Sequence, residues 1–385
     1  MSFDAERAHR EMQALAFPRR SGSPGAEQAR AYLLARLHEA GLTPVLEPFT
    51  FSGRLVERIV PAVVLAVAGL VLAATLAYFV SPAGSLALLL LGFLAGLPAT
   101  RWSYRVERLL DSGELRQSAN IVATLTDPPH PRRHVLLMAH SDSKSQRLPI
   151  AVRTGAALGA LGGGGLLLLG ALWGVLRPGG PLPAGVVVGA GLISTLGLGV
   201  LALNPSGNAS PGALDNAAGV GVLLELARAV PALGLQQTRV TLVITGAEEE
   251  GLAGAVRFFQ AHEGRLGPEA VLINLDSPGA APEVTLLSVF GLPPMGAAPD
   301  LVRLARAAAR TAGIPVRTLW LPAGAGTDHF PAALRGIAAV TLASLGPAFR
   351  RIHTPLDTPA GVLPEGLGNA GRLVLALLRA LDTEE

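Results

Sequence analysis

Residues 244–255, ITGAEEEGLAGA, place three consecutive glutamates directly after an apolar run that extends from Val240 to Ile244. A run of charges normally lies on a solvated helix face or in a loop. This run, Glu248 to Glu250, begins where a buried strand would end. Ligand crevices in open α/β sheets lie at the carboxyl ends of the strands. The stretch therefore indicates an α/β fold with carboxylates at the mouth of a cleft.

Strand and helix patterns alternate along the soluble parts of the chain. The expected strands are 118–125, 135–139, 239–245, 270–275, 284–289, 315–320 and 337–342. The expected helices are 24–41, 216–230, 252–262, 299–312 and 364–382. This alternation predicts a mixed, mostly parallel central sheet with helices on both faces.

Two long blocks of the chain are almost free of charge. Residues 59–100 carry none, and residues 154–176 and 182–203 carry none on either side of a short turn. About 20 apolar residues cross the core of a bilayer, so we predict four transmembrane helices inserted as two hairpins. A buried core hairpin is the alternative, although core helices rarely run so long without a charge. The expected divisions are 1–55, 103–150 and 204–385 for one soluble domain, and 56–102 and 151–203 for the hairpins.

Arginine placement predicts how the chain is oriented in the membrane. Arginines flank the predicted spans on the side of the soluble domain, for example at Arg54, Arg58, Arg101 and Arg153, whereas Arg177 alone lies in the opposite turns. The positive-inside rule then places the domain in the cytoplasm. The first residues also lack the basic-then-apolar layout of a secretory signal peptide. We expect a multi-pass integral membrane protein whose partner is the lipid bilayer.

Composition excludes several classes of function. The chain of 385 residues is 50% hydrophobic and 15% charged, and its net charge is only +3. No basic block is present, so nucleic-acid binding is not supported. The chain contains no cysteine, which excludes disulfides and thiolate metal sites. Any metal site must therefore use His, Asp and Glu.

Candidate ligands follow several of the expected strands. They are His140 and Asp142, Glu248 and Glu249, and Asp276, together with Asp215 before an apolar helix and His353 in a proline-rich loop. Each has an ordinary alternative: Asp215 could be a helix N-cap, His353 a surface residue and His140 a satisfied polar end group. As a set, two histidines and several carboxylates are the ligand types for a pair of divalent ions, zinc first among them. In such sites one carboxylate bridges two ions about 3.5–4 Å apart, and another carboxylate takes the proton of the attacking water.

Six blocks in this order carry a family resemblance: VLLMAHSDS, GALDNAAGVGVLLELAR, ITGAEEEGLAGA, INLDSPG, GTDHF and IHTPLDT. The chain resembles the dizinc aminopeptidases of clan MH, whose relatives include glutamate carboxypeptidases and glutaminyl cyclases. The likeness covers 210–385 continuously, 118–143, and more loosely the N-terminal helices. It implies a sheet of the zinc-exopeptidase type and two zinc ions as cofactors.

The resemblance also implies a role for each candidate. The implied zinc ligands are His140 and Asp276 for one ion, Glu249 and His353 for the other, and Asp215 as the bridge. Glu248 would be the general base, and the Asp142 carboxylate would fix the tautomer of the adjacent histidine. Asp328 would have a supporting role near the rim of the site.

Two residues within the blocks have no expected part in metal binding, and one spacing differs from that of the family. Glu250 matches a variable position and is expected to be solvated, and His329 is expected to be structural. Relatives commonly run from the His-x-Asp block to the bridging Asp within a couple of dozen residues. Here a predicted membrane hairpin separates Asp142 from Asp215. We therefore expect the site to lie near the bilayer surface.

The function expected from these features is that of a membrane-anchored dizinc exopeptidase, first of all an aminopeptidase acting on peptide substrates. Carboxypeptidase action or cyclisation of N-terminal glutamine are alternatives within the clan. An inactive membrane scaffold and a small transporter are alternatives of other classes, and the near-absence of ionisable residues in the predicted spans argues against the transporter. The sequence leaves the oligomeric state and the preferred substrate side chain open.

Overall fold

The computed structural model describes residues 3–102, 110–177, 180, 182–267, 269–291, 294–321 and 326–384, with the side chains of 95–102 outside this description. The chain divides into two compact units. Unit 1 comprises Met1–Gly53, Leu110–Ser145 and Gly207–Glu385, and unit 2 comprises Arg54–Leu109 and Gln146–Ser206. Unit 2 therefore interrupts the sequence of unit 1 twice.

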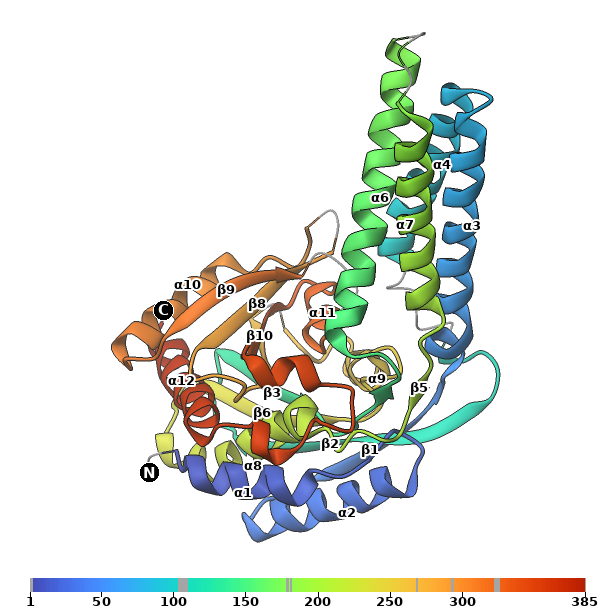
Figure 1. The fold of residues 1–385 in the computed structure, drawn as a ribbon. Coiled ribbons are helices and arrows are strands. Elements are labelled where there is room, and N and C mark those ends of the chain that lie inside the picture. Colours follow the sequence, from blue (N-terminus) through green and yellow to red (C-terminus); the bar gives the residue numbers. More distant parts are fainter. Residues whose placement is uncertain are drawn as a thin grey trace. The chain divides into compact units, whose positions relative to one another are not determined.

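Unit 1 is built on an eight-stranded sheet with the strand order β1-β2-β6-β3-β7-β10-β8-β9 (Figure 1). The strands are β1 (Val45–Ser52), β2 (Leu115–Thr126), β3 (Arg133–His140), β6 (Thr238–Thr245), β7 (Ala270–Leu275), β8 (Val284–Phe290), β9 (Val316–Leu321) and β10 (Ala338–Ala343). The central strands β6, β3, β7 and β10 are parallel, whereas β1, β2 and β8 pair with antiparallel neighbours. This confirms the predicted mixed, mostly parallel sheet.

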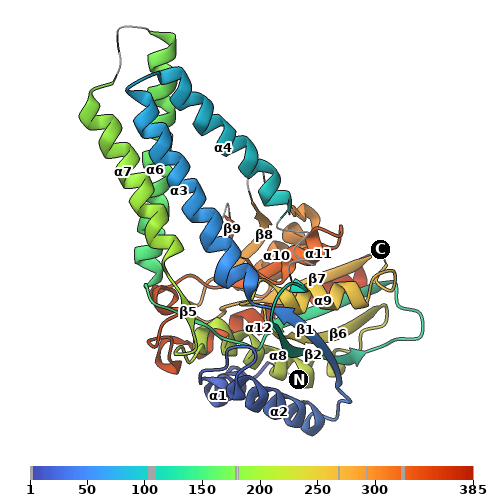
Figure 2. The ribbon, with the colours of Figure 1, turned by 90° about the vertical axis from the view of Figure 1, so that its right-hand side faces the viewer.

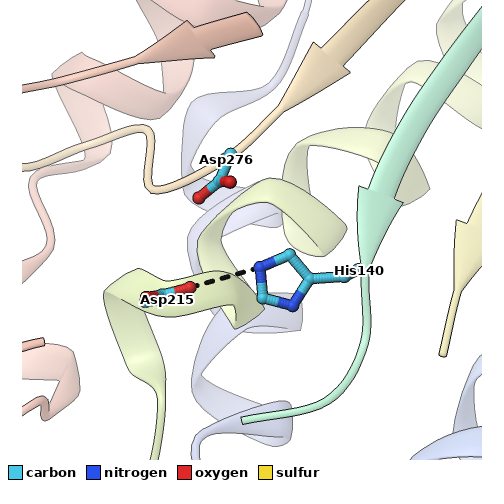
Figure 3. A group of neighbouring side chains, drawn as sticks. All are labelled: His140, Asp215 and Asp276. Carbon is cyan, nitrogen blue, oxygen red and sulfur yellow. Dashed lines mark ion pairs between the residues drawn. The ribbon is translucent and has the colours of Figure 1, made fainter. Parts of the chain in front are cut away.

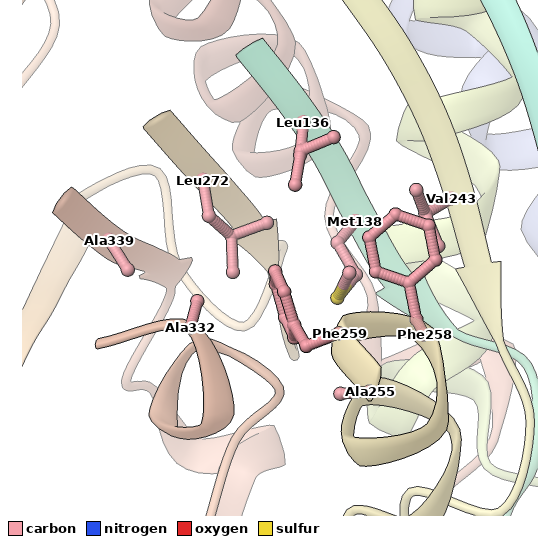
Figure 4. Packing of buried hydrophobic residues seen from close by; sticks show 9 residues of the cluster. All are labelled: Leu136, Met138, Val243, Ala255, Phe258, Phe259, Leu272, Ala332 and Ala339. Carbon is pink, nitrogen blue, oxygen red and sulfur yellow. The ribbon is translucent and has the colours of Figure 1, made fainter. Parts of the chain in front are cut away.

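Helices cover both faces of this sheet. One face is packed by α1 (Ala5–Leu15), α8 (Ala218–Ala229), α10 (Pro299–Thr311) and α12 (Pro364–Thr383), with α2 (Pro24–Glu39) outside them. The other face is packed by α9 (Ala253–Ala261) and α11 (His329–Ala333). Figure 4 shows the core on this second face, where Phe258 and Phe259 of α9 pack against Leu136, Met138 and Leu272 of the central strands. The central strands are therefore buried on both faces, as their continuous apolar runs require.

Unit 2 consists of four long helices that lie side by side (Figures 1 and 2). They are α3 (Val60–Tyr78), preceded by a π-helical turn (Leu55–Ile59), α4 (Pro82–Trp102), α6 (Ile150–Leu176) and α7 (Ala184–Ala202). Among the described residues, three helices are long and apolar enough to cross a membrane: Leu55–Tyr78, Ile150–Leu176 and Ala184–Ala202. In α4 the described apolar part, Pro82–Leu94, is shorter, so a fourth span stays a prediction.

Small residues let the helices of unit 2 approach closely. A Cβ added at Gly163 of α6 would lie 2.4 Å from the Ala190 carbonyl oxygen of α7, and one added at Gly191 would lie 2.1 Å from Thr75 Oγ1 of α3. Large apolar side chains, among them Leu76, Leu161 and Leu196, are instead exposed on the outside of the unit. Small residues between helices and large apolar residues outside are typical of helices packed in lipid.

Most expected elements agree with the structure to within a few residues, and the expected strand 270–275 coincides with β7. Several short elements of the described residues are absent from the sequence prediction, among them α11, β4 (Ser145–Gln146) and β5 (Ser206–Gly207), the last two forming a separate two-stranded sheet. Elements this short contain too few residues for a hydrophobic period to emerge.

Candidate metal centre

The parallel strands β6, β3 and β7 end at the same edge of the sheet, so the residues at and just after their ends lie close together. His140 is the last residue of β3 and pairs in register with Thr245, the last residue of β6. Glu248 and Glu249 follow β6, and Asp276 directly follows β7, the other neighbour of β3. The carboxyl ends of parallel strands thus collect side chains that lie far apart in the sequence.

The first group of candidate ligands contains His140, Asp215 and Asp276 (Figure 3). One donor atom from each residue lies within 4.8 Å of the others. His140 Nε2 lies 3.2 Å from Asp215 Oδ1. His140 Nδ1 lies 3.2 Å from the carbonyl oxygen of Asp142, and since a carbonyl only accepts hydrogen bonds, this contact places the proton on Nδ1. Nε2 is then left as the donor atom for a metal ion.

The second group contains Asp215, Glu249 and His353, again with donor atoms within 4.8 Å of one another. His353 Nε2 lies 2.9 Å from Asp215 Oδ2 and 3.2 Å from Glu249 Oε1. Asp215 therefore belongs to both groups and directs one carboxylate oxygen to each histidine. This is the arrangement that a carboxylate bridging two ions needs.

The backbone around Asp215 is held by side chains rather than by a helix. The N-cap of α8 is Ala217, so Asp215 is not the helix cap that its position before an apolar helix also allowed. The backbone N–H groups of Leu214 and Asp215 donate to the Asp357 carboxylate at 2.8 and 3.2 Å. Asp357, within the block IHTPLDT, did not stand out in the sequence because its partners are backbone groups.

Asp142 holds the two consecutive glutamates through their backbones. Its Oδ1 accepts from the N–H of Glu248 at 3.1 Å and its Oδ2 from the N–H of Glu249 at 3.3 Å. Its carboxylate is 3.5 Å from His140 Nδ1, farther than its own carbonyl oxygen. Asp142 thus contacts the histidine chiefly through its main chain, and its carboxylate orients the glutamate loop.

Glu248 lies beside both groups without belonging to either. Its Oε2 is 3.9 Å from His140 Nε2, and the side chain is 7% exposed. Burial, followed by repulsion from Glu249 and other carboxylates, raises the pKa of Glu248 well above its ordinary value, although His140 opposes the shift. A buried carboxyl group with a raised pKa is suited to accepting and returning a proton.

Lys144 is a charged neighbour of the site that the sequence did not indicate. Its Nζ lies 2.6 Å from Glu249 Oε2, whereas Glu249 Oε1 faces His353. Burial alone would raise the pKa of Glu249, but Lys144 and then His353 outweigh it and lower this pKa to about 2. Glu249 is therefore ionised, with one oxygen held by lysine and the other directed into the second group.

The donor set fits a pair of divalent cations. All donors are imidazole nitrogens or carboxylate oxygens, which suit zinc. His140, Asp215 and Glu249 are buried, whereas Asp276 and His353 are partly exposed. Burial and the charge of Asp215 raise the pKa of Asp276 to about 7. A cation between these carboxylates would relieve their repulsion and stabilise the ionised form.

The residues Asp328 and His329 of the block GTDHF are buried beneath the site and do not lie at its rim. Asp328 is fully buried and accepts a hydrogen bond from the Thr245 hydroxyl at the end of β6. Burial raises the pKa of Asp328 to about 6. His329 is also fully buried, and its Nδ1 lies 2.7 Å from Thr341 Oγ1. Burial lowers the pKa of His329 to about 3, so it is neutral, and it packs edge-on against Phe290.

The expectation that Glu250 is solvated is wrong. Its side chain is 1% exposed, and Oε1 lies 2.7 Å from Arg20 Nε. The turn after β6 directs Glu248 and Glu249 toward the ligands and Glu250 toward the N-terminal segment. Three adjacent carboxylates thus have three different environments, and the third is a buried ion pair.

Replacing Glu250 with glutamine is expected to lower stability without removing metal. The change leaves the Arg20 guanidinium next to a neutral amide, and we expect a cost of about 1–3 kcal/mol. Thermal unfolding and metal content of the purified variant measure the two effects separately. Loss of a metal ion in this variant would place Glu250 among the ligands and contradict the geometry above.

The backbone is unusual at three positions that flank the site. Ala247, Ser277 and His353 have positive φ values of 55°, 57° and 61°. Non-glycine residues adopt this left-handed region infrequently, and such residues gather at functional sites where the surrounding structure maintains them. Here they turn the chain immediately before Glu248, immediately after Asp276 and at His353 itself.

Comparison with known proteins places this arrangement in a family. The sequence profile of peptidase family M28 matches residues 182–378. The chain belongs to peptidase family M28. This confirms the resemblance drawn from the six sequence blocks. Among curated proteins, this M28 chain is 32% identical over 173 residues to aminopeptidase YwaD of Bacillus subtilis (strain 168). That match covers 43% of the chain and 37% of the relative, so the M28 chain spans little more than a third of that protein's length.

Solved structures share the fold of the M28 chain at low identity. An aminopeptidase from Aneurinibacillus sp. strain AM-1 has a TM-score of 0.58 and 16% identity, covering 97% of this chain and 93% of the other. A glutaminyl cyclase from Fimbriiglobus ruber has a TM-score of 0.57 and 15% identity, covering 99% and 96%. BSAP, a zinc aminopeptidase from Bacillus subtilis, has a TM-score of 0.55 and 15% identity, covering 97% and 94%. These likenesses establish the fold.

Proposed function

We propose that the protein is a membrane-anchored, dizinc aminopeptidase that removes N-terminal residues from peptides. The observation that carries this proposal is Asp215, whose two carboxylate oxygens face His140 on one side and His353 on the other. His140 and Asp276 would hold one ion, Glu249 and His353 the other, and Asp215 both. Family membership and the likeness to an aminopeptidase support the same reaction class.

A pair of zinc ions in these two groups would polarise the scissile carbonyl and lower the pKa of the attacking water. The residues of the chain then have separate tasks. Glu248 accepts the proton of the water as it attacks the carbonyl carbon, and it returns that proton to the departing amine nitrogen. Asp142 keeps Glu248 and Glu249 in place by accepting hydrogen bonds from both backbone N–H groups. Lys144 holds the second oxygen of Glu249.

A substrate panel tests the reaction class. The purified full chain is incubated with an amino-acid amide, an N-acetylated peptide and a peptide with N-terminal glutamine, before and after dialysis against a chelator. An aminopeptidase releases ammonia from the amide, spares the acetylated peptide, loses activity on dialysis and regains it with zinc. Cyclisation of the glutaminyl peptide without amide hydrolysis would favour a glutaminyl cyclase, and carboxyl-terminal trimming of the acetylated peptide a carboxypeptidase. A chain that binds no zinc and hydrolyses nothing would be the inactive scaffold.

Unit 2 is proposed as the membrane anchor. Its large apolar side chains are exposed on the outside, which water would disfavour and lipid would accept. Arg177 follows the end of α6 and lies 4.6 Å from the Trp173 ring, a pair suited to a membrane interface. An even number of crossings would keep all segments of unit 1 on one side of the membrane, and the arginine bias supports the cytoplasm as that side.

Cysteine labelling tests the orientation directly, because the natural chain contains no cysteine and gives no background. Val80→Cys introduces a thiol in the turn between α3 and α4, where the native side chain is 90% exposed. Glu263→Cys introduces one in unit 1, after α9. In intact cells an impermeant maleimide is expected to label the cysteine at position 80 and to reach position 263 only after permeabilisation. The reverse pattern would place unit 1 outside the cytoplasm, and labelling of both in intact cells would contradict the proposed topology.

A further inference from the structure

Arg19 occupies an unusual place for a charged side chain. It is only 1% exposed and is the largest fully buried side chain of the described residues. Its guanidinium donates to main-chain carbonyl oxygens, and the part of the chain that the structure describes offers no carboxylate within ion-pairing distance. Burial lowers the pKa of Arg19 to about 10, so the group remains charged at neutral pH. A buried charge whose partners are carbonyls holds particular backbone segments together.

The carbonyls that Arg19 contacts belong to the two loops that carry candidate ligands. Nε donates to the Ser141 oxygen at 2.7 Å, and Ser141 lies between His140 and Asp142. Nη1 donates to the Pro211 oxygen at 2.5 Å and Nη2 to the Gly212 oxygen at 2.8 Å, shortly before Asp215. Two further bonds, to the Leu15 and Phe17 oxygens, anchor the side chain to its own segment.

A second path of hydrogen bonds links the same segments through Ser143. The backbone N–H of Arg19 donates to Ser143 Oγ at 3.2 Å, and the N–H of Ser143 donates to the Arg19 oxygen at 3.4 Å. Ser143 Oγ donates in turn to the Ser210 oxygen at 3.2 Å. The packing is tight here, since a Cβ added at Gly212 would lie 2.5 Å from Ser143 Cβ and 3.0 Å from Arg19 Nη1.

These contacts matter because the two loops are separated by a long insertion in the chain. All of Gln146–Ser206, which belongs to unit 2, lies between the loop of His140 and the loop of Asp215. Yet the first group of ligands brings His140 Nε2 to within 3.2 Å of Asp215 Oδ1. The rigid planar fork of a guanidinium can bind several carbonyls at once, whereas the single ammonium of lysine cannot reproduce that geometry.

We propose that Arg19 is a positioning residue that fixes the spacing between the His140 loop and the Asp215 loop. The proposal rests on the dizinc centre proposed above. Arg19 touches neither ion nor substrate; it acts through the backbone of the loops. The dizinc aminopeptidase would thereby keep a preformed bridged centre although a large insertion separates its ligands.

The test compares Arg19→Lys with Arg36→Met in the full chain purified in detergent. Arg36 is the control, because it is another arginine with a buried partner, Glu11, and that ion pair joins α1 and α2 rather than the two ligand loops. Zinc affinity by chelator competition, kcat, KM and the unfolding temperature are measured for each. For Arg19→Lys we expect zinc affinity to fall about 10–100-fold and kcat to fall with little change in KM. Arg36→Met should lower only the unfolding temperature.

Gly212→Ala provides an independent variant if Arg19→Lys does not fold, because its methyl group would press on the same two loops and should produce the same loss of zinc affinity. The proposal is overturned if either folded variant binds two zinc ions with native affinity and native kcat. Failure of the proposed function has a different signature: the unmodified protein would itself bind no zinc, and this inference would fall with it.

Discussion

Replacing Glu248 with glutamine is expected to lower kcat about 10²–10⁴-fold while both zinc ions remain bound. Glu248 lies outside both ligand groups, so its loss removes the acceptor for the water proton and leaves the donor atoms in place. Glutamine keeps the size of the side chain but cannot accept and return a proton. Turnover of an amino-acid amide and metal content by mass spectrometry measure the two parts of the result.

The neighbouring glutamates provide the controls for this experiment. Glu249→Gln is expected to lose one zinc ion and most activity, whereas Glu250→Gln should keep both ions and most activity. The three adjacent positions should therefore give three different combinations of activity and metal content. A Glu248→Gln variant that loses zinc, or that turns over at the native rate, would refute the assignment of the general base.

Replacing Asp215 with asparagine is expected to remove at least one zinc ion and to lower kcat/KM by about 10³-fold or more. A neutral amide does not present two anionic oxygens, so the site beside His140 and the site beside His353 would lose the carboxylate that they have in common. The surrounding loop should keep its backbone, since the Asp357 carboxylate binds the N–H groups of Leu214 and position 215. Zinc titration with a chromophoric chelator gives the stoichiometry and both affinities.

Asp276→Asn is the comparison for the bridging role, because Asp276 belongs to the first group only. Asp276→Asn should lower the zinc affinity of one site and leave that of the other near its native value. Asp215→Asn should lower the zinc affinity of both sites. If the two variants gave the same pattern, Asp215 would be an ordinary ligand of one ion, and the bridged centre would have to be abandoned.

Much of the fold and the approach of the candidate ligands could be predicted from the sequence, since both follow local patterns. An apolar run that ends at His140, Glu248 or Asp276 predicts a buried strand, and parallel strands deliver the residues at their ends to one edge. Asp215 could be placed only through the family resemblance, because an aspartate before an apolar helix also fits a helix cap. The structure brings the predicted ligands together, while their roles await the experiments above.

Other features could not be predicted, because they depend on contacts between distant segments. The sequence does not show that Glu250 meets Arg20, because the two lie 230 positions apart. Arg19 and Asp357 bind backbone groups. Because every residue has such groups, no pattern of side chains in the sequence predicts these contacts. Lys144 is close to the His140 motif in sequence, but its pairing with Glu249 appears only when β3 and β6 lie side by side.

The distribution of the ligands along the chain also sets a delay in biosynthesis. His140 is the first candidate ligand to be made and His353 the last, so the ribosome adds about 210 residues between them, which takes about 10–40 s. The Arg19 segment and β3 exist throughout that time, but the second group of ligands is incomplete until His353 emerges. A chain interrupted in this interval lacks at least one of the ligands and is expected to be inactive, which keeps an unfinished chain from acting on its surroundings.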